Sequence, residues 1–217
     1  MKVVSVNVGL PREVAWHGRI VRTSIFKRPV DGRVALTTLN LDGDRQADLS
    51  VHGGPFKAVY CYPSEHYAYW KQQLPGRELP VAIFGENFTT AGMAEHTVHI
   101  GDQFAIGSAH VVVTQPRMPC FKLGVRFQSN DMVRRFLASG RSGFYLAVRR
   151  EGEVGAGDEV VLISRDPGAV PVSEITRLYA VESPDAADLE SMRRAVGVAA
   201  LPESWKEYFR EQLETYA

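Results

Sequence analysis

The distribution of glycine divides the chain into two parts with different folding constraints. Of the 19 glycines in 217 residues, Gly197 is the single one beyond residue 171. Frequent glycines permit the tight turns that short strands need, whereas a glycine-poor stretch with apolar residues at spacings of three and four is typical of helices. The sequence therefore predicts a strand-rich domain over residues 1–168 and a helical segment over residues 169–217.

The first part has the pattern of a β-barrel built from short strands. Apolar and β-branched runs alternate with clusters of Gly, Pro and Asp, and short helices are expected after Ser64 and near Asn130. Many short strands with few helices are typical of a closed or nearly closed barrel, so the expected fold class is mainly β (α+β). We expect strands over residues 3–8, 18–25, 33–39, 58–62, 97–100, 103–106, 110–114, 144–149 and 159–164.

The second part carries three amphipathic helical patterns. The last of them places Trp205, Tyr208 and Phe209 on one side, after the helix opener Pro202. We interpret this aromatic stripe as helix-packing core, and it is also compatible with a homodimer. A small three-helix segment is the simplest structure for these residues.

Charge and composition exclude several classes of protein. Lys plus Arg and Asp plus Glu number 25 each, so the chain lacks the basic excess of proteins that neutralise nucleic-acid phosphates. Residues 172–217 hold nine acidic and five basic residues, which leaves a mild basic excess in residues 1–171 that suits an anionic small ligand. We expect neither a signal peptide nor a membrane span, and two isolated cysteines favour a reducing cytoplasm.

Two polar clusters in the barrel part could bind a ligand. His52, Gly53 and Gly54 precede Lys57, and this turn is either an anion site made of backbone amides or simply a tight connection. Glu86 and Asn87 form a polar pair inside an apolar stretch. Buried polar groups need partners, so this pair serves either a ligand or a structural hydrogen-bond network.

Cys120 is the most informative single residue. Pro116 and Pro119 stiffen its loop, and Arg117 and Lys122 flank it. Neighbouring positive charge favours the thiolate form, which attacks electrophiles or binds metal. By contrast, Cys61 lies among apolar and aromatic residues and is predicted to be structural. A zinc site would need about four Cys or His ligands and is disfavoured, whereas a Cys–His hydrolase that uses His52 stays open.

Taken together and in order, these stretches resemble the MOSC domain family, and most closely its YiiM-like group. The resemblance covers nearly the whole chain, and the C-terminal segment is similar to the three-helix extension of that group. It implies a barrel that binds molybdenum cofactor, a pterin dithiolene with a phosphate tail, and a tungsten form is compatible with it. The carrying stretches are residues 41–44, 51–58, 62–67, 84–87 and 115–120.

The resemblance also implies roles for individual residues. Cys120 matches the cysteine that ligates molybdenum and is the candidate metal ligand and catalytic residue. His52 and Glu86 are candidates for catalytic proton delivery. The remaining candidates contact the anionic cofactor, and they are Gly53, Gly54, Lys57, Asn87 and Arg117.

The activity implied by the family is reduction of N-hydroxylated compounds such as 6-N-hydroxylaminopurine, in detoxification. The chain has no iron–sulfur or G-x-G-x-x-G pattern, so a separate electron-donating reductase is expected. Pyridoxal phosphate binding is a further association of the family. Two alternatives remain beside the reductase: a sulfur carrier with a persulfide on Cys120, and a binding domain without turnover.

Overall fold

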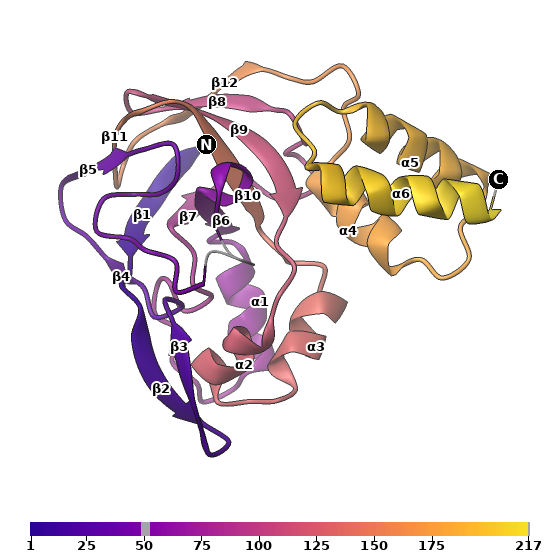
Figure 1. The fold of residues 1–217 in the computed structure, drawn as a ribbon. Coiled ribbons are helices and arrows are strands. Elements are labelled where there is room, and N and C mark those ends of the chain that lie inside the picture. The colour runs from indigo at the N-terminus through magenta and orange to yellow at the C-terminus, as the bar shows by residue number, and fades with distance from the viewer. Residues whose placement is uncertain (49–52, 217) are drawn as a thin grey trace.

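The computed structural model describes residues 1–48 and 53–216, and its largest element is an eight-stranded sheet. The strand order in this sheet is β12-β8-β9-β10-β6-β7-β1-β4, while β2–β3 and β5–β11 form separate two-stranded sheets (Figure 1). The strands are β1 (Lys2–Val8), β2 (Arg12–Trp16), β3 (Arg19–Thr23), β4 (Arg28–Pro29), β5 (Arg33–Leu36), β6 (Val59–Pro63), β7 (Phe88–Ala91), β8 (Gln103–Ile106), β9 (Ala109–Pro116), β10 (Phe144–Arg150), β11 (Gly152–Gly155) and β12 (Val160–Ser164).

The large sheet closes on itself, as the sequence predicts. The start of β1 meets the residues before β12: the Val3 amide donates to the Asp158 carbonyl at 2.9 Å, and the Gly157 amide donates to the Val3 carbonyl at 2.8 Å. The Val160 amide adds a bond of 3.0 Å to the Met1 carbonyl. Closure removes most of the exposed strand edge and encloses the valines and leucines of the alternating strands in one core.

Helices cover one flank of the barrel and extend from it. The helices that precede residue 140 are η1 (Pro55–Lys57), α1 (His66–Gln73), α2 (Phe121–Phe127) and α3 (Met132–Ala138). A second apolar cluster lies beneath the last three and is rich in aromatic rings, with Trp70 and Phe136 stacked at 5.9 Å between centroids. This cluster supports the loops at one end of the barrel.

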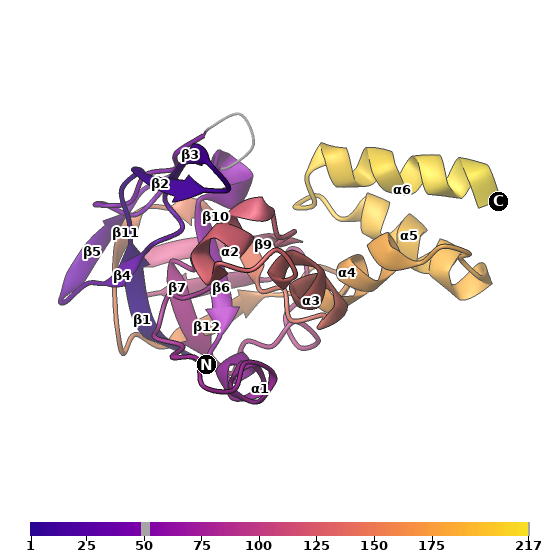
Figure 2. The same ribbon diagram turned by 90° about the horizontal axis from the view of Figure 1, so that it is seen from below.

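The C-terminal helices are α4 (Val172–Ala180), α5 (Ala186–Gly197) and α6 (Glu203–Tyr216), and they project from one side of the barrel (Figure 2). Trp205 and Phe209 belong to the same apolar cluster as the barrel interior. The Trp205 indole donates a hydrogen bond of 2.9 Å to the Gln115 side chain of β9. Strand β9 is therefore covered on both faces, which explains why nearly all of its residues are buried.

The strand expected over residues 97–100 is wrong. These residues form a turn, with an isolated bridge between His99 and Pro171. The reason is a local side-chain bond: the buried Asp102 carboxylate accepts from the His99 amide at 3.0 Å, and the Asp102 amide donates to the His99 carbonyl at 3.0 Å. A side chain that bonds the backbone in this way competes with a sheet ladder.

Among the helices that the structure describes, none combines the length and apolar character that crossing a bilayer requires.

Candidate functional site

One pocket brings together most of the predicted site residues. It opens beside helix α2 and encloses about 690 Å³ including its solvent-open mouth. Gly53, Lys57, Asn87, Arg117 and Cys120 all line it, although they come from distant parts of the chain. The full described lining is Thr23, Ser24, Ile25, Lys27, Asp44, Gln46, Ala47, Gly53, Lys57, Tyr60, Gly85, Asn87, Arg117, Met118, Cys120, Lys122 and Tyr145.

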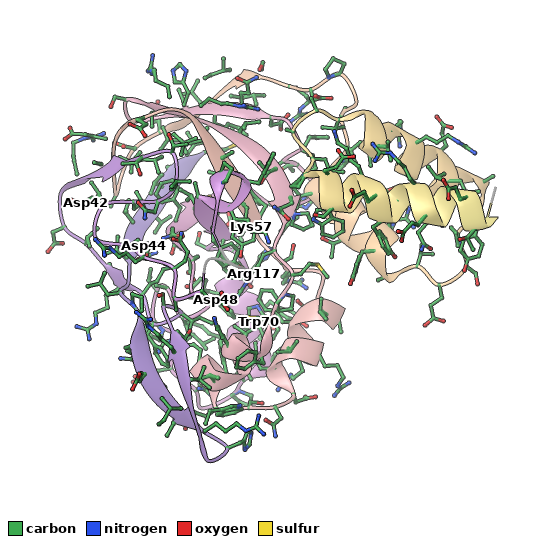
Figure 3. The ribbon with its side chains drawn as sticks, viewed as in Figure 1. Asp42, Asp44, Asp48, Lys57, Trp70 and Arg117 are labelled. Atoms are coloured by element: carbon green, nitrogen blue, oxygen red, sulfur yellow. The ribbon has the colours of Figure 1, made fainter. Side chains whose placement is uncertain are left out.

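Arg117 lies at the inner side of this pocket, just beyond the end of β9 (Figure 3). Its guanidinium donates to the Phe84 carbonyl at 3.0 Å and to the Tyr60 hydroxyl at 3.2 Å, and it lies 4.6 Å from the Tyr60 ring centroid. Burial alone would lower the pKa of Arg117, but the neighbouring Tyr60, Tyr145 and Cys120 groups outweigh it and hold the pKa above its ordinary value. Arg117 is thus a permanent, buried positive charge.

A second buried cation is Lys27, which the sequence analysis missed. Lys27 forms an ion pair with Asp44, and both side chains are almost fully buried. Burial lowers the pKa of Lys27 although Asp44 opposes the change. Asp44 also accepts from the Gly9 amide and from the Asn87 side chain, each at 2.8 Å, so this carboxylate ties three chain segments to the pocket floor.

The charge of the pocket is positive. Four of its described lining residues are basic, namely Lys27, Lys57, Arg117 and Lys122, and Asp44 is the one acidic residue among them. Burial also lowers the pKa of Lys57. Cations held in a partly water-excluded cavity attract an anionic ligand more strongly than the same charges on an open surface.

The two cysteines occupy different environments. Cys120 directly precedes α2, is partly exposed and lines the pocket. Cys61 is fully buried in β6, where burial, aided by the Glu86 charge, raises the pKa of its thiol well above the ordinary value. The structural interpretation of Cys61 agrees with this burial, and Cys120 has the access that a ligand-binding thiol needs.

The side chains of the adjacent residues Glu86 and Asn87 lie in different environments. Asn87 lines the pocket, but its side chain is bonded within the protein, to the Tyr60 amide at 3.1 Å and to the Asn7 carbonyl at 3.2 Å. Glu86 is fully buried behind the pocket wall and accepts from the Tyr67 hydroxyl, from Thr89 and from the Ala82 amide. Burial raises the pKa of Glu86. Direct proton delivery from Glu86 into the pocket stays a prediction.

The glycine turn is only partly in the pocket. Gly53 lines it with a φ of 86°, a conformation that favours glycine, whereas Gly54 lies outside the lining and starts η1. His52, the third member of the expected anion site, lies outside the described residues. Gly85 is required on the opposite wall, because a Cβ there would lie 2.7 Å from the Ile25 side chain.

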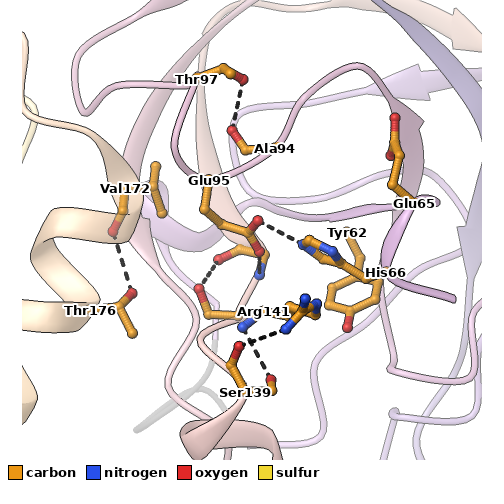
Figure 4. Close-up of polar contacts among 12 residues, drawn as sticks. Tyr62, Glu65, His66, Ala94, Glu95, Thr97, Ser139, Arg141, Val172 and Thr176 are labelled. Atoms are coloured by element: carbon orange, nitrogen blue, oxygen red, sulfur yellow. Dashed lines mark hydrogen bonds and ion pairs between the residues drawn. The ribbon is translucent and has the colours of Figure 1, made fainter. Parts of the chain in front are cut away.

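A separate polar network fixes the loop that supports Arg117 and Tyr60. Glu95 is buried, contacts the His66 ring nitrogen at 2.7 Å and accepts from the Gly143 amide at 2.7 Å (Figure 4). The Gly143 carbonyl accepts from the Arg117 amide at 3.2 Å, and the Ser142 carbonyl accepts from the Tyr60 hydroxyl at 2.8 Å. The network therefore positions two pocket residues from behind without contacting the cavity.

Sequence reasoning missed Lys27, Tyr60 and Tyr145 as pocket residues. Each lies in or near a strand and has no motif around it, so nothing local distinguishes it from an ordinary strand residue. Within the described ranges, no three His, Cys, Asp or Glu side chains gather closely enough to hold a metal ion by themselves.

Comparisons with known proteins agree with this arrangement. A family model described as MOSC domain matches residues 48–161, and one described as YiiM-like, 3-alpha helix domain, matches residues 170–215. The uncharacterized protein YflK of Bacillus subtilis (strain 168) is 42% identical, with 97% of this chain and 93% of YflK covered. A protein named reductase from Gibberella moniliformis is 33% identical over 75% of this chain, but only 29% of that protein is matched. The crystal structure of YiiM from Geobacillus stearothermophilus superposes with a TM-score of 0.80 at 36% identity, covering 98% of both chains.

Proposed function

The chain belongs to the MOSC domain family and carries a YiiM-like three-helix domain, and on this premise we propose that it binds molybdenum cofactor and reduces N-hydroxylated compounds. The observation that carries the proposal is the convergence of Cys120, Arg117 and Lys57 on one positively charged pocket. A tungsten form would use the same residues. Pyridoxal phosphate, the other cofactor associated with the family resemblance, gains no support from the comparisons.

The pocket suits an anionic cofactor with several hydrogen-bonding groups. Its lining has more basic than acidic residues, which complements a phosphate tail. The Ser24 hydroxyl lines the pocket, is buried, and has no hydrogen-bond partner within the described part of the chain. A buried hydroxyl without a partner is costly, so a ligand group or water that bonds Ser24 would remove that cost.

Cys120 supplies the soft donor that such a cofactor requires. Thiolate is the protein ligand best suited to a sulfur-rich metal centre. The Arg117 guanidinium interacts electrostatically with Cys120, so a buried positive charge lies close to the proposed metal ligand. The remaining metal ligands would come from the cofactor, so the scarcity of clustered ligand side chains among the described residues is no obstacle.

In this proposal the residues of the chain bind, orient and shield the cofactor. When bound, the cofactor supplies two-electron redox chemistry at the metal. Lys57 and the Gly53 amide would hold its anionic tail, while Arg117, fixed by Phe84 and Tyr60, would hold charge close to Cys120. Asn87 and Asp44 would keep the floor rigid. His52 and Glu86 remain the predicted proton sources for the two protons that N–OH reduction consumes.

We infer that a separate reductase supplies the electrons, because residues 1–217 contain no recognisable electron-carrier motif. The relative from Gibberella moniliformis supports this: it is named a reductase, and the region that matches this chain is 29% of its length. We infer that the substrate is a small N-hydroxylated molecule that reaches Cys120 through the pocket mouth.

The test compares the two cysteines in cofactor retention. Wild type, Cys120→Ala and Cys61→Ala are purified from a host that makes molybdenum cofactor, then molybdenum, tungsten and oxidised pterin are quantified. We expect stoichiometric cofactor in wild type and in folded Cys61→Ala, and loss of metal together with reductase activity on N-hydroxylated bases in Cys120→Ala.

Loss from Cys61→Ala but not from Cys120→Ala would contradict the proposal. Absence of pterin from every sample, with a known molybdenum enzyme loaded in the same host as control, would favour the sulfur carrier instead. In that case, the intact protein should carry an extra sulfur atom on Cys120 that a reductant removes.

A further inference from the structure

A second hollow lies behind one wall of the pocket. It encloses about 810 Å³ including open solvent and is formed by the β2–β3 hairpin, by Phe26 and by helix α2. In Figure 1 this hairpin projects from the lower end of the molecule beside α2. The described lining consists of Arg12, Val14, Ala15, Trp16, His17, Phe26, Val125, Arg126 and Gln128.

Two guanidinium groups meet at one aromatic ring in this hollow. The Arg12 guanidinium carbon lies 3.6 Å from the Phe26 ring centroid, and that of Arg126 lies 4.9 Å from the same centroid. Cation–π contacts stabilise each arginine separately, but the charge of Arg12 disfavours the charge of Arg126. A third arginine, Arg77, lies over the adjacent Phe127 ring at 4.9 Å and adds to the positive field.

Nothing in the hollow neutralises this charge. None of its described lining residues is acidic, and neither Arg12 nor Arg126 takes part in an ion pair within residues 1–48 and 53–216. The Nε atom of Arg126 is buried and has no hydrogen-bond partner in the same part of the chain. A buried charged donor left without an acceptor is strongly unfavourable.

The electrostatics agree with the geometry. Burial, followed by the charge of Arg12, lowers the pKa of the Arg126 guanidinium. Arginines elsewhere in the molecule have carboxylate partners, for example Arg165 with Asp102 and Arg177 with Asp188. What distinguishes Arg126 among the arginines of the described residues is its buried Nε without a hydrogen-bond partner, and this atom calls for an acceptor from outside the chain.

We propose that this hollow is a second anion-binding site, which takes the phosphate or carboxylate group of a small molecule between the Arg12 and Arg126 guanidinium groups. Such oxyanions match guanidinium donors in charge and in geometry, and they can bond two arginines at once. The inference does not depend on the proposed function, because none of these residues lines the cofactor pocket.

The site shares its walls with the pocket. Ser24, Ile25 and Lys27 line the pocket, whereas Phe26 between them lines the hollow. Helix α2 repeats this arrangement, with Lys122 toward the pocket and Arg126 toward the hollow. An anion that bonds both Arg12 and Arg126 therefore links β2 to α2 on the side of the shared wall that faces the hollow.

The test observes the arginine Nε–H groups directly by ¹H–¹⁵N NMR. Inorganic pyrophosphate and succinate are titrated separately, in a Lys57→Gln background that weakens binding in the pocket. The Arg126 Nε–H signal is assigned by its disappearance in Arg126→Lys. We expect a saturable shift of this signal with at least one probe, and the probe that produces it identifies phosphate or carboxylate as the preferred group.

Matched variants make the result decisive. Loss of one charge-assisted contact in Arg12→Gln should weaken binding about tenfold. Arg134→Gln at the same end of the molecule should leave binding unchanged, because Arg134 is exposed and pairs with Asp131. The proposal is overturned if neither probe, added without precipitation, gives a saturable shift of the Arg126 Nε–H signal. It is also overturned if Arg12→Gln binds the probe as tightly as its parent does.

Discussion

Apart from the Lys27–Asp44 ion pair, the proposed cofactor pocket and the C-terminal helices differ in how they hold positive charge. In the helices, Arg177 pairs with Glu174 and Asp188 at 2.9 and 2.6 Å, and Arg210 pairs with Glu203 at 2.6 Å. In the pocket, Arg117 and Lys57 are buried or half-buried without a carboxylate partner among the described residues, and Arg117 is held by a carbonyl, a hydroxyl and aromatic rings instead.

This difference distinguishes cations that stabilise the fold from cations that are available to a ligand. A cation that is paired within the chain contributes to stability, if only modestly at a surface. A cation that is desolvated without a partner costs stability until a ligand supplies the opposite charge. The comparison supports the proposal that the pocket binds an anion, whereas the arginines Arg177 and Arg210 of the helices are paired within the chain.

The largest expected effect comes from removing a large buried side chain in the C-terminal helices. Phe209 is fully buried between α6 and the barrel core, so Phe209→Ala should lower the free energy of unfolding by about 3–5 kcal/mol. Urea denaturation measures the loss, and pterin per folded molecule should stay at the wild-type level. Tyr216→Ala is the control and should lower the free energy of unfolding far less, because Tyr216 is exposed and loses one hydrogen bond of 3.0 Å to the Glu182 carbonyl. A selective fall in pterin would show that the helices belong to the site.

An intermediate test uses the different pH windows in which the two regions change stability in cofactor-free protein. Burial lowers the pKa of Lys57 below its ordinary value of 10.5, so the unfolded chain binds more protons in the window between the two values. The wild type should therefore gain stability as the pH rises through that window, and the gain should be smaller in Lys57→Met.

The helices should respond at the acidic end. The hydrogen bond from Arg177 lowers the pKa of Glu174 below its ordinary value of 4.5. Its stabilisation is present above 4.5 and is lost as the pH falls, and Glu174→Gln should reduce that loss. Unfolding at constant ionic strength between about pH 3 and pH 11 covers both limbs. If Lys57→Met gains as much stability at alkaline pH as the wild type does, the prediction that the buried Lys57 charge costs stability is contradicted.

The smallest expected effect concerns an exposed pair in α5. Arg193 and Glu190 lie 3.4 Å apart with more than half of each side chain exposed. Arg193→Gln should change the free energy of unfolding by no more than about 0.5 kcal/mol, and cofactor content should not change. A loss of more than about 1 kcal/mol by urea denaturation would mean that paired charge matters more in the helices than this comparison assumes.

The elements with clear local signals were predictable. The strand over residues 3–8 and the helix after Ser64 correspond to β1 and α1, because a β-branched run and an apolar i, i+3 pattern act within a few residues. Helix α2 was not predicted. The segment around Cys120 and Lys122 was interpreted from its reactive and charged residues and not from the spacing of its apolar residues. The turn at 97–100 was missed because the Asp102 side chain, not strand propensity, decides it.

The residues of the candidate site also differ in whether the local sequence predicted them. Cys120, Arg117 and Lys57 stand in glycine- and proline-bounded clusters whose order along the chain resembles a known family, so the sequence alone was enough to propose them as candidates. Lys27, Tyr60 and the Glu95–His66 support have no such context. Barrel closure and register brought them to the pocket or behind it, and those depend on long-range packing between strands that no local window of sequence contains.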